Sequence, residues 1–405
     1  LFEVLANPDT PQNSIYHALL RGEADATSPS EALFIGPNER DFVSQGIETR
    51  FRLDGDTGPV SHRLEYGIRF HNDRIERRHS EDAFLMTGGQ LVPEGSPTIV
   101  TAFNEAESNA LAVHVLDAMT FGPFTLTPGV RVELIQSTFT DKIAGTEQGS
   151  AVQVFLPGVG GYLTLVEGLG LLAGVYRGMS PPPPGAEPQI EPEITVNYEA
   201  GLRYQRHGHH AELVGYYNDY SNLTDVCTLS SGCVDDNLDR QFDAGHARIY
   251  GLEAFAEDEL VWGAVRFPLS LAYTLTLTEF LESFESEDPI FGNVQKGDEM
   301  PYVPKHEGRI NLGLELAPIA TYVSFSYISP MREEAGNTPI DQSLATDEQF
   351  AVDAGVSYDL LTPIRTRFYL QARNLLDDQS LVSRRPYGAR PNAPRWVQAG
   401  AKVEF

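Results

Sequence analysis

The sequence predicts an all-β protein, a transmembrane antiparallel β-barrel. Apolar and polar residues alternate along many segments, these segments run for about 10 to 14 residues, and the connections between them alternate between short and long. Alternation with a period of two is typical of strands with one apolar face. Soluble strands usually have about 5 or 6 residues, whereas about ten tilted residues cross a hydrocarbon layer. A soluble β-sandwich also alternates, but it gives no reason for such regular connections.

We expect about fifteen strands. They lie near residues 42–53, 62–74, 107–120, 124–139, 151–163, 169–178, 194–207, 209–220, 244–258, 264–280, 306–317, 319–330, 349–361, 365–377 and 394–405. In the last of them, Val397, Ala399 and Ala401 alternate with Gln398 and Lys402. The polar face also carries arginines among glutamates, which a water-filled lumen tolerates while the apolar face meets lipid.

The connections give a topology. Short ones include Gly122-Pro123, the turn from Arg206 to His209, Ala317-Pro318 and Leu361-Thr362-Pro363. Long ones lie roughly at 75–106, 179–193, 221–243, 281–305, 331–348 and 378–393. Outer-membrane barrels have short periplasmic turns and long external loops. If the last strand ends in the periplasm, every long connection is external, residues 1–41 are an external loop or strand remnant of an upstream part of the barrel, and residues 42–405 form the barrel.

Composition excludes two other classes. The 405 residues carry a net charge of −28, which argues against nucleic-acid binding because that function needs a basic face. No run of about 20 uncharged apolar residues exists, so a helical membrane protein is disfavoured. Leu1 is not a natural start, and we expect the numbering to begin inside a longer precursor.

The two cysteines, Cys227 and Cys233, lie six residues apart in a polar segment. One close pair in this setting predicts a loop disulfide in an oxidising space, which agrees with an external loop. His207, His209 and His210 resemble a metal cluster, but they fall in a predicted periplasmic turn, which favours solvated side chains. We expect no metal site there.

Residues 371–378 read Gln-Ala-Arg-Asn-Leu-Leu-Asp-Asp, and Ala393-Pro394-Arg395 opens the last strand. These C-terminal segments resemble the ending of TonB-dependent receptors. In that family an Asn-Leu-hydrophobic-Asp turn closes the penultimate strand and Pro-Arg opens the final one. Phe405 ends the strand and resembles the aromatic signal read by the barrel-assembly machinery.

Further motifs follow in the order of the same family. Residues 171–182 resemble a strand that ends in Arg-Gly-aromatic-Ser-Pro-Pro, with Met179 in place of the aromatic residue. The other similar segments are Glu191-Pro192-Glu193, the strand 196–204, Tyr250-Gly251-Leu252-Glu253 and Pro304-Lys305-His306. Together they cover roughly residues 124–405 and most resemble the ferric-citrate-type subgroup.

The resemblance implies a 22-stranded barrel closed by an N-terminal plug, of which about 15 or 16 strands are present here and the plug and first strands are absent. We expect a truncated sequence, and a stand-alone smaller barrel is the alternative. The resemblance further implies a monomeric receptor of the cell outer membrane that takes up a ferric chelate, citrate-like or a siderophore. Its partners would be outer-membrane lipid, lipopolysaccharide, the barrel-assembly machinery and, through the plug, the inner-membrane TonB energy-coupling complex. It implies no catalysis and no resident cofactor.

Two functional alternatives remain at this point. One is a receptor of the same family for cobalamin, another siderophore or an oligosaccharide. The other is a passive porin-like or adhesin-like barrel, which a plug with an energy-coupling box would exclude.

An anionic chelate needs cationic contacts, and the guanidinium fork suits carboxylates. The candidates are Arg177 at a predicted external strand end, Arg384, Arg385 and Arg390 in the last loop, and the lumen residues Arg50 and Arg69. The alternative is that the lumen arginines pair with glutamates such as Glu48, Glu65 and Glu199.

An acidic loop opposes a uniformly basic entrance. Its members are Glu279, Glu282, Glu285, Glu287, Asp288, Asp298 and Glu299. It is either solvated, a Ca²⁺ site, or a bridge to lipopolysaccharide through divalent ions, because hard cations prefer carboxylate oxygen.

Overall fold

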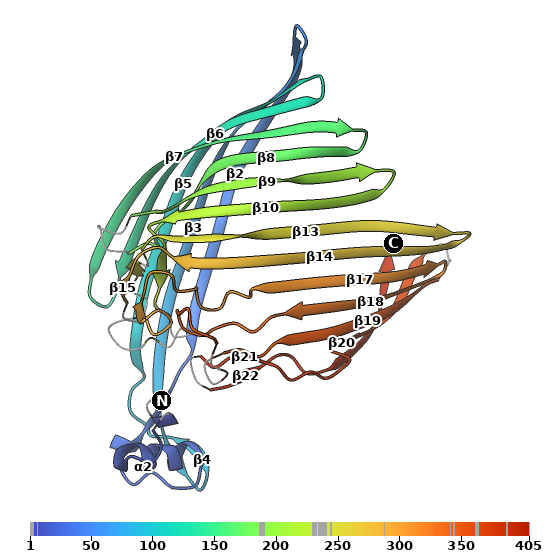
Figure 1. Ribbon diagram of the computed structural model, residues 1–405. Helices are drawn as coiled ribbons and strands as arrows, with labels where there is room; N and C mark the ends of the chain where they lie inside the picture. The colour runs from blue at the N-terminus through green and yellow to red at the C-terminus, as the bar shows by residue number, and fades with distance from the viewer. Residues whose placement is uncertain are drawn as a thin grey trace.

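Fifteen long strands of the computed structural model form one continuous antiparallel sheet, in which each strand pairs with the next along the chain (Figure 1). They are β2 (Asn38–Thr57), β3 (Val60–Thr87), β5 (Ile99–Phe121), β6 (Phe124–Asp141), β7 (Thr146–Val166), β8 (Leu169–Ser180), β9 (Glu193–Arg206), β10 (His209–Ser221), β13 (Ala247–Trp262), β14 (Val265–Phe280), β17 (His306–Leu316), β18 (Ile319–Ile328), β19 (Gln349–Leu360), β20 (Arg365–Arg373) and β23 (Trp396–Glu404). The structure describes residues 4–5, 7–185, 191–228, 233, 241–243, 245–286, 288–340, 342, 345–360, 364–385 and 388–404. The predicted all-β class and the fifteen predicted strands are confirmed.

The connections divide the sheet into two ends. At one end, called the short-turn end, neighbouring strands are joined by two residues at 58–59, 122–123, 167–168, 207–208, 263–264 and 317–318. Glycine occupies several of these turns, for example Gly58 at φ 61° and Gly122 at φ 56°, a conformation that costs other residues energy. The opposite, long-loop end carries the connections 181–192, 222–246, 281–305, 329–348 and 374–395. The predicted turn Leu361-Thr362-Pro363 lies outside the described residues.

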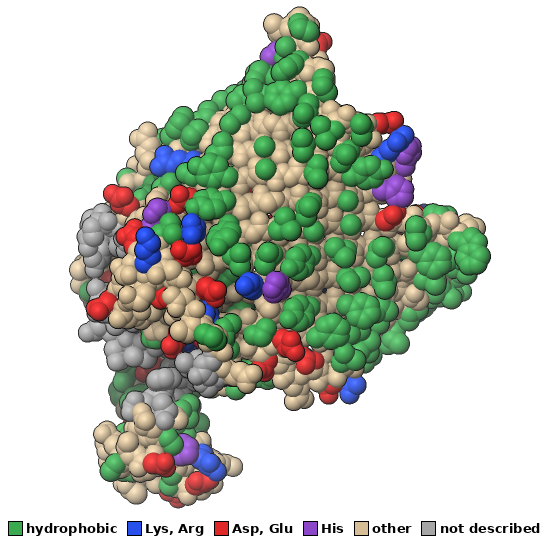
Figure 2. Space-filling view, in the orientation of Figure 1, with side chains coloured by type: hydrophobic (Ala, Val, Ile, Leu, Met, Phe, Trp, Pro, Cys, Tyr) green, Lys and Arg blue, Asp and Glu red, His purple; other side chains and the backbone are tan. Residues whose placement is uncertain are grey.

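The two faces of the sheet differ in chemistry, as the alternation predicts. On the outer face Phe51 pairs with Tyr66 in register, and their rings stack with centroids 5.2 Å apart. On the other face Glu48 pairs with Arg69. Figure 2 shows hydrophobic side chains spread over the sheet surface in view, with charged side chains collected mainly toward its ends. We call the polar face the lumen face.

One predicted long loop is wrong over most of its length. Residues 75–106 were expected to be a loop, but β3 and β5 stay paired as far as Glu81 and Ile99. In this strand extension, charged residues such as Arg74 and Glu105 occupy the outer face, which is apolar closer to the short-turn end. The alternation of apolar and polar residues is therefore lost there, although the strands remain hydrogen-bonded.

A small unit sits at the tip of this extension (Figure 1). It contains the helix α2 (Pro11–Leu20), the 3-10 helix η1 (Pro29–Glu31) and the strands β1 (Leu33–Ile35) and β4 (Gln90–Pro93), both paired with β3. The Thr10 hydroxyl accepts a hydrogen bond from the Asn13 backbone N–H at 3.3 Å and caps α2. Strand β2 begins at Asn38, four residues before the predicted barrel boundary, and the division at residue 42 stays a prediction. No helix within the described residues has the length and apolar character to cross a membrane.

The sheet has two free edges. Among the described residues, β2 pairs only with β3, and β23 pairs only with β20. Phe405, the predicted assembly signal, lies outside the described residues.

The Asn-Leu-Leu-Asp motif forms the turn that leaves β20. Asn374 and Asp377 both adopt positive φ, at 47° and 56°. The Asn374 side chain donates to the carbonyls of Asp378 at 2.8 Å and Ala393 at 2.9 Å, and accepts from the Asp378 N–H at 2.9 Å. Asparagine suits this position because its short amide tolerates the left-handed region and bonds the local backbone.

Candidate functional site

A hollow of about 770 Å³ lies against the sheet between β2 and β9. Register places Arg50, His114 and Arg131 of its lining together on the lumen face, because Arg50 pairs with Gly67, Gly67 with His114, and His114 with Arg131. The volume falls in the range of about 300–1,000 Å³ typical of small-molecule sites. The hollow is therefore large enough to be a candidate small-molecule site.

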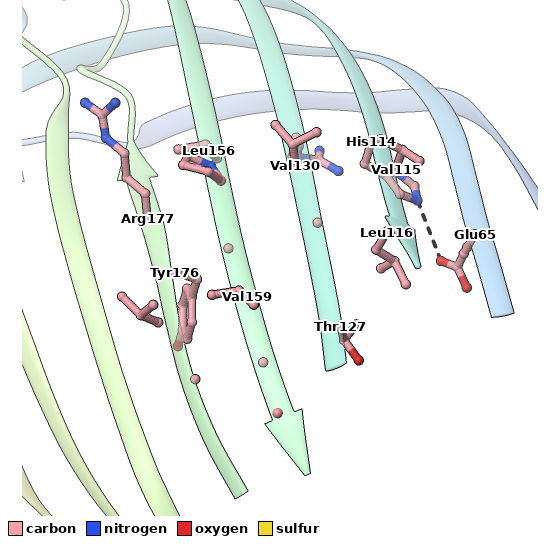
Figure 3. Close-up of a pocket in the computed structure, with 18 of the residues that line it drawn as sticks. Glu65, His114, Val115, Leu116, Thr127, Val130, Leu156, Val159, Tyr176 and Arg177 are labelled. Carbon is pink, nitrogen blue, oxygen red and sulfur yellow. Dashed lines mark ion pairs between the residues drawn. The ribbon is translucent and has the colours of Figure 1, made fainter. Parts of the chain in front are cut away.

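Two pairs form among the charged groups that line the hollow. Arg50 donates to Glu48 at 2.7 Å. The His114 Nε2 atom lies 3.6 Å from the Glu65 carboxylate (Figure 3). These contacts agree with the interpretation that lumen arginines and glutamates neutralise each other, and a ligand would compete with exposed pairs that contribute only about 0–1 kcal/mol each.

Two further ion pairs continue this row of charged side chains along the lumen face, here called the charged wall. Arg131 donates to Glu133 at 2.5 Å, and Arg203 donates to Glu212 at 2.6 Å. The Tyr176 hydroxyl donates to Glu199 at 2.9 Å. The wall thus offers both cationic and hydroxyl donors within reach of the hollow.

The floor of the hollow is apolar and shaped by glycine. Leu156 and Leu172 line it together with Gly158, Gly160 and Gly174. A Cβ on Gly158 would lie 2.9 Å from the Tyr176 Cβ, so a larger residue there would displace the tyrosine. An apolar floor with charged sides suits a ligand that has both apolar and anionic parts.

The three predicted strand arginines do not all share this wall. Arg50 and Arg69 lie on the lumen face and are exposed. Arg177 borders the hollow toward the long-loop end (Figure 3), but it shares the face of Val175, and its guanidinium donates to the Phe155 carbonyl at 3.3 Å. Arg50 and Arg177 line the hollow and Arg69 does not, whereas Arg50 and Arg69 share the lumen face and Arg177 lies on the other face.

The predicted loop arginines bind other parts of the protein. Arg384 donates through Nη1 to the Ala345 carbonyl and through Nη2 to the Gln342 carbonyl at 3.0 Å. Arg385 donates through Nη2 to Glu334 at 2.9 Å and to the Pro289 carbonyl at 3.1 Å. Both guanidinium groups therefore tie loops together, while Arg390 is exposed in β22 (Arg390–Pro391). Ligand binding by these three residues stays a prediction.

The loops over β13 to β20 form a folded unit, here called the cap: the described parts of 222–246, 281–305, 329–348 and 374–395. In its core, the buried side chains of Val294 and Met300 pack with the buried Ala247 and Phe280, which stand at the cap ends of β13 and β14. The Phe280 ring makes edge contacts with Phe284 and Phe291 at centroid distances of 5.4 and 6.0 Å. Burial of Tyr302 within the cap raises the pKa of its hydroxyl.

Most of the acidic loop lies inside the cap, and three of its carboxylates have separate protein partners. Glu279 bonds Arg248 at 2.5 Å, Asp298 accepts the Gln295 N–H at 2.8 Å, and Glu299 bonds Arg332 at 3.2 Å. Glu287 lies outside the described residues. The Ca²⁺ and lipopolysaccharide-bridging expectations stay predictions.

Sequence reasoning found the charged wall but not its centre. Arg131 and Arg203 belong to the polar face that alternation predicts, whereas His114 and Tyr176 were not singled out. The sequence gives only the face on which each lies: His114 stands between Val113 and Val115, so it belongs to the polar face of its strand. The register that sets His114 beside Arg131 involves two strands and cannot be read from either alone.

Comparison with known proteins agrees with this architecture. Residues 8–375 match a family model described as TonB dependent receptor-like, beta-barrel. Among solved structures, the ferric citrate transporter FecA in its unliganded form is similar, with a TM-score of 0.70 and 20% identity over 92% of this chain and 56% of that chain.

Two further structures show the same fold. The ferric preacinetobactin receptor BauA from Acinetobacter baumannii has a TM-score of 0.69 and 16% identity, and the ferric yersiniabactin receptor FyuA from Yersinia pestis has 0.65 and 16%. Each match covers 92% of this chain and 56% of that chain. This chain therefore spans little more than half the length of the structures it resembles.

Proposed function

The chain belongs to the TonB-dependent receptor β-barrel family, and on this premise we propose that it forms the barrel wall of an outer-membrane receptor that imports a ferric chelate by energy-coupled transport. The family consists of transport receptors, so the chain is not an enzyme. The three solved structures named above are a ferric citrate transporter, a ferric preacinetobactin receptor and a ferric yersiniabactin uptake receptor, which supports iron chelates as the first cargo class to test.

The observation that carries the cargo proposal is the lumen hollow. It combines an apolar floor around Leu156 and Leu172 with donors from Arg50, His114 and Arg131. Guanidinium groups bind carboxylate oxygens with two parallel hydrogen bonds, and a ferric chelate presents such oxygens. Glu48 and Glu65 on the same wall would release Arg50 and His114 to an anionic ligand and then face solvent.

The topology supports an orientation. We place the long-loop end outside the cell and the short-turn end in the periplasm, as barrels of this kind arrange their loops. Outer-membrane lipid and lipopolysaccharide would then contact the apolar outer face, the barrel-assembly machinery would insert the chain as a monomer, and an inner-membrane TonB complex would supply energy.

Direct binding tests the cargo. Full-length protein in detergent would be titrated with ferric citrate, a ferric catecholate, a ferric hydroxamate, cobalamin and an oligosaccharide. We expect a ferric chelate to bind most tightly and Arg50→Gln with Arg131→Gln to weaken that binding. The cargo proposal is falsified if every ferric chelate fails while cobalamin or the oligosaccharide binds.

Radioactive iron uptake tests the transport mode. Cells that make the receptor should accumulate iron from the bound chelate, and collapse of the inner-membrane proton gradient should stop that accumulation. Uptake that persists without the gradient, together with steady ion conductance in planar bilayers, would instead identify a passive pore.

A further inference from the structure

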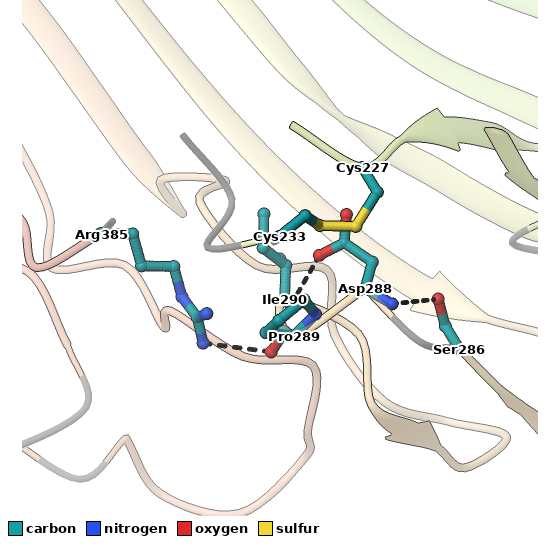
Figure 4. The surroundings of a disulfide bond; sticks show 7 residues. All are labelled: Cys227, Cys233, Ser286, Asp288, Pro289, Ile290 and Arg385. Atoms are coloured by element: carbon teal, nitrogen blue, oxygen red, sulfur yellow. Dashed lines mark hydrogen bonds between the residues drawn. A yellow bond between two sulfur atoms is a disulfide. The ribbon is translucent and has the colours of Figure 1, made fainter. Parts of the chain in front are cut away.

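A buried carboxylate faces the disulfide of the cap (Figure 4). The disulfide joins Cys227 to Cys233 with a Cα–Cα distance of 5.7 Å, and both residues are buried. Asp288 comes from a different loop and is 0% exposed. Its carboxylate oxygen and the two Sγ atoms all lie within 4.8 Å of one another.

One oxygen of this carboxylate has no hydrogen-bond donor. Oδ1 accepts the Ile290 N–H at 2.9 Å, but Oδ2 is buried without a partner among the described residues. A disulfide has no hydrogen to donate, so the sulfur atoms cannot satisfy it. An unpaired buried acceptor costs about 1–3 kcal/mol, more when charged, and calls for an explanation such as an ion or a redox role.

The backbone around Asp288 holds the carboxylate in this position. Its N–H donates to the Ser286 hydroxyl at 3.1 Å, and its carbonyl accepts from Phe291 and Gly292 at 3.0 and 2.9 Å. Arg385 donates to the carbonyl of the adjacent Pro289 at 3.1 Å (Figure 4). The carboxylate is therefore aimed at the sulfur atoms by a structured turn.

We propose that reduction of this disulfide creates a binding site for a thiophilic divalent cation such as Zn²⁺. Its ligands are Cys227, Cys233 and Asp288. A thiol or phosphine reductant supplies two electrons, and two protons complete the two thiols as the S–S bond breaks. The cation then displaces the two thiol protons and bonds both thiolates and the Oδ2 atom. Zn–S bonds of about 2.3 Å and Zn–O bonds of about 2.0–2.2 Å keep the ligands of one ion within about 4.6 Å of each other, close to the observed grouping.

The bound cation would change which loops are linked. The disulfide closes a ring inside the loop 222–246, whereas Asp288 belongs to the loop 281–305. A cation that bonds all three residues ties these two loops together. The same three residues thus give a loop-internal link when oxidised and an inter-loop link when reduced and metal-loaded.

Titration with Co²⁺ as a spectroscopic probe and Zn²⁺ as competitor tests the proposal. Full-length protein in detergent would be compared with and without a phosphine reductant. We expect reduced protein to bind one equivalent of Co²⁺ with a thiolate-to-cobalt charge-transfer band that Zn²⁺ abolishes, and oxidised protein to show no band.

Substitutions assign the ligands. Asp288→Asn keeps an acceptor for the Ile290 N–H and should weaken binding at least about tenfold. Asp298→Asn is the matched control, because Asp298 is a buried carboxylate of the same loop, and its binding should stay unchanged. Reduced wild-type protein without the band, or Asp288→Asn with wild-type affinity, would overturn the proposal.

Protease protection of the loop 281–305 is the second readout. Zn²⁺ should protect this loop in reduced wild-type protein and give no added protection in the Cys227→Ser, Cys233→Ser double variant. Equal protection in the double variant would assign the effect to another site and overturn the proposal.

Discussion

Two parts of the molecule reach beyond the apolar band at the long-loop end, and they are stabilised differently. The strand extension of β3, β5 and β6 continues the backbone ladder and carries partly exposed ion pairs such as Arg74–Glu105 at 2.9 Å. The cap instead buries Phe280 and Val294 completely. The extension therefore depends on strand pairing, and the cap depends on side-chain packing.

This difference has a functional consequence. Surface ion pairs contribute about 0–1 kcal/mol each, whereas truncation of a buried aromatic residue costs about 3–5 kcal/mol. Single substitutions should open the cap and leave the extension paired. A cap that opens as a unit is suited to control access to the lumen, while a ladder of strands is suited to hold the small helical unit at its tip.

The largest effect is expected from Phe280→Ala. Removal of the ring leaves a cavity beside Phe284 and Phe291 and should lower the free energy of cap opening by about 3–5 kcal/mol. Hydrogen exchange of peptides from 281–305 should accelerate, with the extension unchanged. Phe368→Ala is the control, because Phe368 is 50% exposed on the outer face. Equal acceleration in both variants would contradict a packed cap.

Asn374→Ala should have the next largest effect. It removes three side-chain hydrogen bonds of about 0.5–1.5 kcal/mol each and places alanine at φ 47°, so we expect a loss of about 2–3 kcal/mol at the base of the cap. Asn374→Gly keeps the backbone conformation and separates the two causes. Exchange of peptides from 374–395 measures both, and equal losses would show that the backbone conformation contributes little.

Arg384→Ala should lower the free energy of cap opening by about 2 kcal/mol, because charge-assisted hydrogen bonds to the Gln342 and Ala345 carbonyls are lost. It also leaves the buried Glu333 carboxylate without the guanidinium 3.8 Å away. Arg390→Ala, in the same connection but exposed, is the matched control. A double-mutant cycle with Glu333→Gln should give a smaller loss than the sum, and strict additivity would show that the two side chains do not interact.

The strand sheet, the extension and the cap differ in how far the sequence predicts them. Alternation located all fifteen long strands, because residues such as Phe368 and Leu370 repeat with a period of two. It missed the extension, where Arg74 and Glu105 occupy outward positions and no apolar face remains. Alternation could not predict the cap either, because Ala247, Phe280, Val294 and Met300 are spread over more than fifty residues and meet only in the folded chain.

For the candidate site, residue type and pairing within one strand were predictable, and contacts between loops were not. Arg50 was placed correctly on the polar face, and its pairing with Glu48 follows from their spacing of two on one strand. Arg384 and Arg385 were expected at a ligand, but their partners are Gln342, Ala345, Glu334 and Pro289, which lie in other loops. Loop-to-loop contacts leave no periodic signal.

The smallest effect is expected from Lys142→Met in the turn that ends β6. The Lys142 ammonium bonds Glu76 at 2.5 Å and Glu105 at 2.8 Å, and lies 4.8 Å from the Phe103 ring centroid. Methionine keeps the apolar contact and removes both ion pairs, so exchange of peptides from 99–110 should change only slightly and not at all in high salt. These pairs raise the pKa of Lys142 above 10.5 and lower the pKa of Glu105 below 4.5.

A raised lysine pKa contributes stability that is lost as pH rises through the folded value, and a lowered glutamate pKa contributes stability that is lost as pH falls through the folded value. The wild-type extension should therefore lose protection at both extremes, and the variant should lose less. Lys402→Met, which removes one exposed pair on β23, should leave these peptides unchanged. If Lys142→Met instead opened the extension as far as Phe280→Ala opens the cap, ion pairs rather than the strand ladder would hold the extension, and the contrast between the two regions would fail.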